Sequence, residues 1–95
     1  MAIYIGLHNY TDKGIKSIDQ TVERADTFKR MAIEKDITVR NIYWTQGEFD
    51  IITIVEGAEE AVNALHLQLR REGNVNSKIC RAFSPAEMTT MVMGF

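Results

Sequence analysis

The sequence has little of several residues that would mark common classes of protein. Its one cysteine, Cys80, has no partner for a disulfide within the chain, so we expect a protein of the reducing cytoplasm. One proline and six glycines are too few for a linker or a low-complexity segment. No apolar run approaches the roughly 18 residues of a membrane span, and residues 1–10 lack the basic stretch of a signal peptide. These absences indicate one cytoplasmic domain over residues 1–95 with no membrane partner.

The chain also lacks an excess of positive charge. It carries 11 Lys and Arg against 13 Asp and Glu, which gives a formal net charge of −2. Neutralising nucleic-acid phosphates requires clustered cations in surplus, so we expect no nucleic-acid partner. The chain is 45% hydrophobic and 25% charged, which is typical of a folded globular domain and excludes a disordered chain.

The hydrophobic pattern predicts alternating strands and helices. Period-2 patterning and β-branched residues favour strands over residues 2–10, 37–46, 49–56 and 76–83. Apolar stripes at helical spacing favour helices over 19–35 and 57–72, a short last helix follows Ser84-Pro85, and residues 11–14 read as a turn. This order predicts an α+β, ferredoxin-like βαββαβ fold, with a four-stranded antiparallel sheet of order 4-1-3-2 and both long helices on one face.

The other face of this sheet is expected to be open. We place Ile3, Ile5 and Leu7 under the helices, together with a buried Cys80 and Ala82. The residues expected on the open face are Tyr4, Gly6, His8, Tyr10, Ile52, Ile54, Ile79, Arg81 and Phe83. Such a face would be an unusual apolar patch for a monomer, so we expect self-association into a homodimer or a larger homo-oligomer.

Three motifs resemble one known family. They are the stretch of residues 9–15, the hairpin of residues 43–50, and Gly73-Asn74-Val75 followed by Arg81-Ala82-Phe83. In this order, over nearly the whole chain, they are similar to the GYD domain family, whose motif is Gly, then Tyr, then Asp. Gly47, Phe49 and Asp50 match that motif with Phe in place of Tyr, so a phenolic hydroxyl is absent there. The resemblance implies a ferredoxin-like subunit of a dimeric α+β barrel and implies no activity.

His8 is the strongest candidate for chemistry. It is predicted on a central strand with Tyr10 beside it, Arg81 on the fourth strand and Asp50 on the third. Such a cluster would bind an anion or transfer a proton. The alternative is an interfacial histidine that only forms structural hydrogen bonds. Asp50 has a second interpretation as well, in which its carboxylate only holds the hairpin turn.

Other residues are candidates for binding a ligand rather than for catalysis. Tyr43, Trp44 and Phe49 would wall a flat apolar pocket, and Gly6 would leave room for a ligand or for a close backbone. Core or dimer contacts are the preferred explanation for Tyr43 and Trp44. No spacing of His and Cys fits a metal site, and we expect His66 to be a solvated surface residue.

Two functions from different classes remain open. In the first, a homodimeric α+β barrel binds a small organic ligand and acts as an isomerase-like or oxygenase-like enzyme without a cofactor, with proton transfer by His8. In the second, the protein is a non-catalytic ligand-sensing or assembly module, and its sheet face is only a dimer interface.

Overall fold

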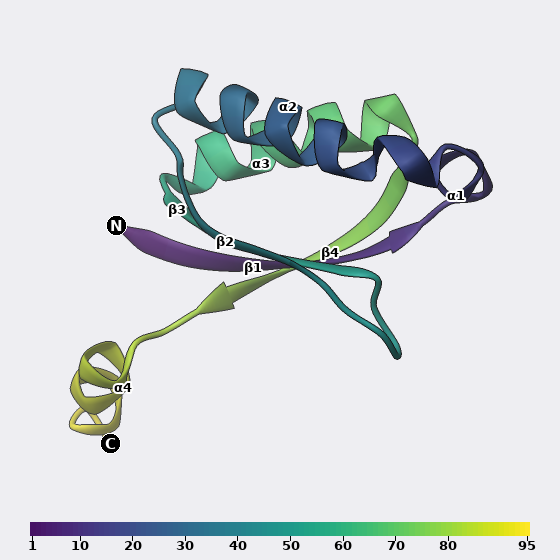
Figure 1. The fold of residues 1–95 in the computed structure, drawn as a ribbon. Helices are drawn as coiled ribbons and strands as arrows, with labels where there is room; N and C mark the ends of the chain where they lie inside the picture. The colour runs from purple at the N-terminus through teal and green to yellow at the C-terminus, as the bar shows by residue number, and fades with distance from the viewer.

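The computed structural model describes all 95 residues as one sheet covered by helices on one side (Figure 1). The elements are β1 (Ala2–Tyr10), α1 (Asp12–Lys16), the 3-10 helix η1 (Ile18–Gln20), α2 (Thr21–Glu34), β2 (Thr38–Trp44), β3 (Ile51–Gly57), α3 (Glu59–Glu72), β4 (Val75–Ala82) and α4 (Pro85–Val92). The sheet is antiparallel with the order β2-β3-β1-β4. The predicted α+β, ferredoxin-like topology is therefore confirmed.

The segment after β1 is helical, whereas we predicted a turn over residues 11–14. Thr11 caps α1, because its side chain accepts a hydrogen bond from the Gly14 N–H. A 3-10 turn then leads into α2, so the first long helix begins at Thr21 rather than at Asp19. Asp, Lys and Gly are typical turn residues, but the threonine cap overrides that preference.

Gly14 brings α1 against the chain between α3 and β4. Thr11 donates from its backbone N–H to the Asn74 carbonyl oxygen at 3.1 Å and from its hydroxyl to the Gly73 carbonyl oxygen at 2.6 Å. A Cβ at Gly14 would lie 2.0 Å from the Asn74 carbonyl oxygen. Only a residue without a side chain permits this approach, which fixes α1 over one end of the sheet.

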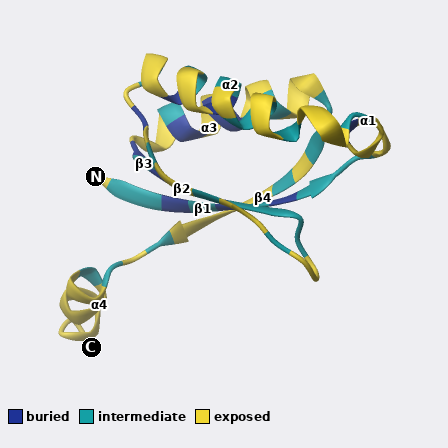
Figure 2. Cartoon of the chain, viewed as in Figure 1, coloured by how far each residue is buried: buried dark blue, intermediate teal, exposed yellow.

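The core lies between the sheet and the two long helices (Figure 2). Its seven buried hydrophobic residues are Tyr4, Phe28, Ala32, Ile37, Val55, Val62 and Leu65. Acidic Glu59 and Glu60 in the first turn of α3 and basic Arg70 and Arg71 in its last turn match the helix dipole. Gly73 ends α3 in the left-handed conformation at φ 76°.

The predicted facing of β1 is wrong. Tyr4, Gly6 and His8 are buried toward the helices, whereas Ile3, Ile5 and Leu7 point to the open face. The register carries this inversion to β4, where Arg81 pairs with Tyr4 and Cys80 pairs with Ile5. Residues directly opposite each other in a sheet share a face, so Ile79 and Arg81 lie on the helix side and Cys80 and Ala82 on the open side. The Cys80 thiol is exposed instead of buried.

The predicted facing of β3 is confirmed, because Ile52 pairs with Leu7 and Ile54 pairs with Ile5. On β2, a register shift between Val39 and Asn41 sets the side of each aromatic residue. Trp44 pairs with Ile51 on the helix side, and Tyr43 pairs with Ile52 on the open side.

The last helix stands away from the rest of the domain. Figure 1 shows α4 beyond the end of β4, on the side of the sheet away from α2 and α3. Ser84 and Glu87 form a capping box at its start, and Pro85 occupies the first turn. No residue of α4 is buried, and Met88, Met91 and Val92 are exposed. None of the helices combines the length and apolar character that a membrane crossing requires.

Candidate functional site

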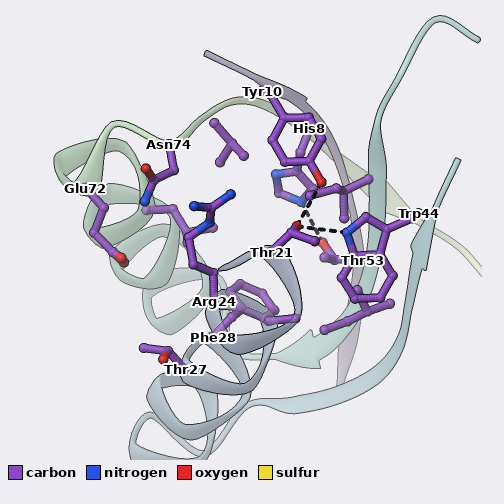
Figure 3. A pocket seen from close by; sticks show the side chains of 15 residues that line it. His8, Tyr10, Thr21, Arg24, Thr27, Phe28, Trp44, Thr53, Glu72 and Asn74 are labelled. Carbon is purple, nitrogen blue, oxygen red and sulfur yellow. Dashed lines mark hydrogen bonds between the residues drawn. The ribbon is translucent and has the colours of Figure 1, made fainter. Parts of the chain in front are cut away.

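A cavity of about 230 Å³ lies between the sheet and the helices α2 and α3 (Figure 3). Fifteen residues line it, and they come from β1, β2, β3, α2, α3 and the start of β4. Its apolar wall consists mainly of Phe28, Ile42, Trp44, Ile51, Leu69 and Val75. His8, Tyr10, Thr21, Arg24 and Thr53 are among its polar residues. The cavity is therefore an apolar space with a few polar groups, which is the usual composition of a small-molecule site.

His8 lies at the sheet side of this cavity and is only 2% exposed. Its Nδ1 is 2.7 Å from Ser77 Oγ, and its Nε2 is 2.9 Å from Thr53 Oγ1. Burial, together with the charge of nearby His66, lowers the pKa of His8 to about 4. The ring is therefore neutral at pH 7, with one nitrogen donating to a hydroxyl and the other accepting from one.

The absence of a side chain at Gly6 leaves space for the His8 ring. A Cβ on Gly6 would lie 2.5 Å from His8 Nε2 and 2.4 Å from Thr53 Oγ1. Atoms this close would collide, so the ring and the Thr53 hydroxyl occupy the space that a side chain would fill. Side chains of this chain therefore fill the space beside Gly6, which is neither of the two roles that we predicted for it.

His66 is buried rather than solvated, contrary to our expectation. It is 4% exposed, and its ring lies parallel to that of His8 with centroids 6.1 Å apart. Its Nδ1 donates to the Val62 carbonyl oxygen at 2.9 Å, and Nε2 has no hydrogen-bond partner. Burial lowers the pKa of His66, and the bond to the Val62 carbonyl opposes this shift. Two neutral imidazoles, one from α3 and one from β1, are therefore stacked between the helix and the sheet.

Three polar side chains meet at the wall of the cavity, beside His8. Thr21 Oγ1 accepts a hydrogen bond from Trp44 Nε1 at 3.0 Å and lies 2.8 Å from the Tyr10 hydroxyl. Figure 3 shows Thr21 between the two aromatic rings. This arrangement links β1, α2 and β2, and it holds the phenol and the indole at the cavity wall.

Asp50 has a structural role, but its carboxylate bonds β1 rather than the hairpin turn that we considered. Its Oδ2 accepts a hydrogen bond from the Tyr10 backbone N–H at 2.9 Å, and its own N–H donates to the His8 carbonyl oxygen at 2.9 Å. Thr45 closes the same hairpin, because its hydroxyl donates to the Phe49 carbonyl oxygen at 2.6 Å. The Asp50 carboxylate therefore extends the pairing of β1 and β3, and it does not line the cavity.

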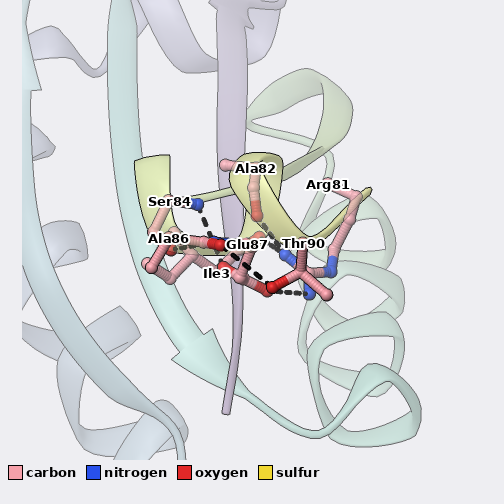
Figure 4. Close-up of polar contacts among 7 residues, drawn as sticks. All are labelled: Ile3, Arg81, Ala82, Ser84, Ala86, Glu87 and Thr90. Carbon is pink, nitrogen blue, oxygen red and sulfur yellow. Dashed lines mark hydrogen bonds and ion pairs between the residues drawn. The ribbon is translucent and has the colours of Figure 1, made fainter. Parts of the chain in front are cut away.

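Arg81 is separated from His8. It pairs with Tyr4, whereas Ser77 pairs with His8, so four residues of β4, about 13 Å, separate the two positions. Its guanidinium lies 4.4 Å from the centre of the Phe83 ring and bonds the Glu87 carboxylate at 3.2 Å (Figure 4). Bonds from the Ser84 backbone and from Arg81 lower the pKa of Glu87. Arg81 thus connects the end of β4 to α4 rather than joining a cluster with His8.

Of the aromatic residues predicted to wall a ligand pocket, only one lies at the cavity. Trp44 lines the cavity, whereas Tyr43 and Phe49 do not. Tyr43 is 54% exposed on the open face, where its hydroxyl accepts a hydrogen bond from Asn41 Nδ2. No three His, Cys, Asp or Glu side chains are arranged so that they could hold a metal ion.

Several cavity residues were not predicted from the sequence, among them Thr21, Arg24, Thr53 and Asn74. Thr21, Arg24 and Phe28 are three and four residues apart, so they share one side of α2. The sequence shows that spacing, but a threonine and an arginine on an otherwise charged helix are usually exposed to solvent, so the spacing alone did not indicate a cavity. Their role depends on where α1 and β2 come to lie.

The fold and the cavity define a ferredoxin-like α+β domain with a small pocket between its sheet and its helices. A sequence profile of the GYD domain matches residues 4–92, so the chain belongs to the GYD domain family. The resemblance seen in the motifs is thereby confirmed. A search of curated proteins found no match to the chain.

Proposed function

We propose that this GYD domain binds a small organic molecule in the cavity between its sheet and helices. The observation that supports this function is the cavity itself, with its apolar walls, its buried neutral His8 and the hydroxyls of Tyr10, Thr21 and Thr53. Its volume of about 230 Å³ lies just below the usual range of about 300–1,000 Å³ for ligand pockets. The ligand is therefore small.

His8 is the group that would transfer a proton in an isomerase-like reaction without a cofactor. In the tautomer that carries its proton on Nδ1, Nε2 accepts from the Thr53 hydroxyl, and Thr53 lines the cavity. A proton leaving the ligand would pass through that hydroxyl to Nε2, a route that needs no movement of the strand. Tyr10 would orient the ligand through its hydroxyl, which also lies at the cavity wall.

A second candidate function, a non-catalytic ligand-sensing module, is favoured by the hydrogen bonds of His8. Both ring nitrogens already have structural partners, Ser77 and Thr53. A pKa of about 4 also makes the ring a weak base at neutral pH, whereas general bases work best with a pKa near the operating pH. In this case the cavity binds a ligand that is not converted.

The two functions differ in the outcome for an enolisable probe such as phenylpyruvate. If His8 transfers protons, the protein should accelerate the keto–enol exchange, and His8→Gln should reduce that acceleration by about 100-fold or more. Ultraviolet absorbance of the enol measures the rate, and circular dichroism confirms that the variant is folded. An unchanged rate in the variant would exclude His8 as the proton-transfer group. Wild-type protein that binds phenylpyruvate without acceleration would support the sensing module.

We also propose that two copies associate through their open sheet faces. This face carries Ile3, Ile5, Leu7, Ile52 and Ile54 on the two central strands, with no helix over them. Burial of an aliphatic side chain contributes about 1.5–3 kcal/mol, so contact of this face with a second sheet is favoured over contact with water. The exposed apolar side chains of α4 lie on the same side and would join the contact.

The dimer predicts a specific response to charge. Ile54→Lys places an ammonium group in the middle of the open face and should convert a dimer to monomers in light scattering. Val22→Lys is the matched control, because Val22 is 59% exposed on α2, away from that face. A monomeric wild-type protein, or a dimer that survives Ile54→Lys, would contradict the proposed interface. Slow reaction of Cys80 with a maleimide would be a second sign that the face is covered.

A further inference from the structure

Arg24 has an unusual set of partners. It lies on α2, and its guanidinium is held by neutral oxygens at the end of α1. Nη1 donates to the Ser17 carbonyl oxygen at 3.1 Å and to the Ser17 hydroxyl at 2.8 Å, and Nη2 donates to the Gly14 carbonyl oxygen at 3.2 Å. Three of its five N–H groups are therefore used, and two remain free.

The charge of Arg24 is not neutralised by the protein. The ion pairs of the chain are Arg40 with Glu56 and Arg81 with Glu87, both away from this site. Glu72 is the one acidic residue that lines the cavity, and it forms no ion pair with Arg24. Arg24 is half-buried, so its cation is partly removed from water without a carboxylate to balance it.

The side chain of Arg24 lines the cavity. Figure 3 shows its side chain extending from α2 into the space that the labelled residues surround. Its bonds to Gly14 and Ser17 fix the side chain there, so little rotamer entropy remains to be lost when an anion binds. A planar guanidinium with two free donors is suited to a carboxylate, which accepts two parallel hydrogen bonds.

The rest of the cavity determines the remainder of the ligand. Phe28, Trp44 and Leu69 present apolar surface to the ligand. Arg24 is the one Lys or Arg side chain that lines the cavity, so a dianion would lack a second cation. A ligand with one carboxylate and an apolar body satisfies both parts of the site. The small volume admits a body of the size of one ring or a short branched chain.

We infer that Arg24 is the anchor for the carboxylate of a small, apolar monocarboxylic acid whose body lies against Phe28 and Trp44. This inference rests on the proposed function of the cavity as a ligand site, and it names the class of ligand. Arg24 is a binding residue in this assignment and transfers no proton.

The test compares an acid with its neutral counterpart on the intact protein. Trp44 is the one tryptophan of the chain and lines the cavity, so its fluorescence reports binding of phenylacetate and of phenylacetamide. We expect phenylacetate to bind at least about tenfold more tightly, because a hydrogen bond between two charged groups is stronger than one to a neutral amide. Arg24→Gln should remove that preference, and Arg24→Lys should retain part of it.

Glu72→Gln is the matched control, because it changes a charge at the same cavity without touching the anchor. It should leave the preference for phenylacetate in place or increase it. Equal binding of the acid and the amide by the wild-type protein would overturn the role of Arg24 and leave the ligand site standing. Failure of both probes to bind would overturn the ligand site and, with it, this inference. The wild-type comparison decides the question even if Arg24→Gln does not fold.

Discussion

Replacement of Gly14 by alanine is expected to lower the free energy of unfolding by about 3 kcal/mol or more. The new Cβ would lie 2.0 Å from the Asn74 carbonyl oxygen, and this is a backbone atom that no side-chain rotation moves away. Alanine gains about 1 kcal/mol over glycine in a helix, which is too little to compensate. Relief of the collision would separate α1 from the Asn74 segment and weaken the bonds that Thr11 makes to it.

Urea unfolding followed by circular dichroism measures this loss. Gly94→Ala is the matched control, because its Cβ would lie 3.3 Å from its nearest neighbour, the Met91 carbonyl oxygen, near the chain end. The control should differ from wild type by less than about 0.5 kcal/mol. If both variants unfold at the same urea concentration, the close approach of α1 to Asn74 is wrong. Gly14 also supplies a carbonyl to Arg24, so the variant should bind phenylacetate more weakly.

Acid is expected to destabilise the protein through the buried histidines. The pKa of His8 is about 4 in the folded protein and near 6.5 in the unfolded chain, so the unfolded chain takes up the proton first. The stabilisation is complete above about pH 6.5, falls as the pH is lowered, and is lost by about pH 4. The difference between a pKa of 6.5 and one of about 4 corresponds to a loss of about 3 kcal/mol. His66 acts in the same direction, since its pKa is also lowered.

The measurement is the free energy of unfolding between pH 7 and pH 4 for wild type and for His8→Gln. The variant should be less stable at pH 7 but should lose less stability on acidification, because it lacks the His8 titration. The His8 ring signals in an NMR titration give its pKa directly. A midpoint near 6.5 would show that the ring is exposed to water, contrary to the structure.

The order of the elements was readable from the sequence, but the facing of β1 was not. One of its two alternating sets is aliphatic and the other carries Tyr4 and His8, so hydrophobicity favoured Ile3, Ile5 and Leu7 for the core. The structure instead buries Tyr4, Gly6 and His8. The choice depends on shape and hydrogen bonds, because Gly6 accommodates the His8 ring and Thr53 and Ser77 bond its nitrogens. These partners lie 45 and 69 residues away in the chain, beyond the reach of local pattern.

The candidate site was predictable only in part, for a related reason. His8, Tyr10 and Trp44 were identified from residue type and do line the cavity. Arg81 was grouped with them because residue type does not reveal the register of β4 against β1. His66 was missed although it follows Val62 by four residues, a spacing that places it on the buried side of α3. A histidine at this position of the apolar stripe of α3 is the sequence signal that predicts its burial.

The central strand β1 forms a wall shared by two separate surfaces. Its even-numbered residues from Tyr4 to Tyr10 face the core and the cavity, and its odd-numbered residues from Ile3 to Leu7 face the open side. Insertion or deletion of a single residue within this strand would exchange the two sets. The histidine would leave the cavity at the same time as isoleucines left the exposed surface. Length variation between homologous chains is therefore expected in the 46–49 loop and after β4, and not within β1.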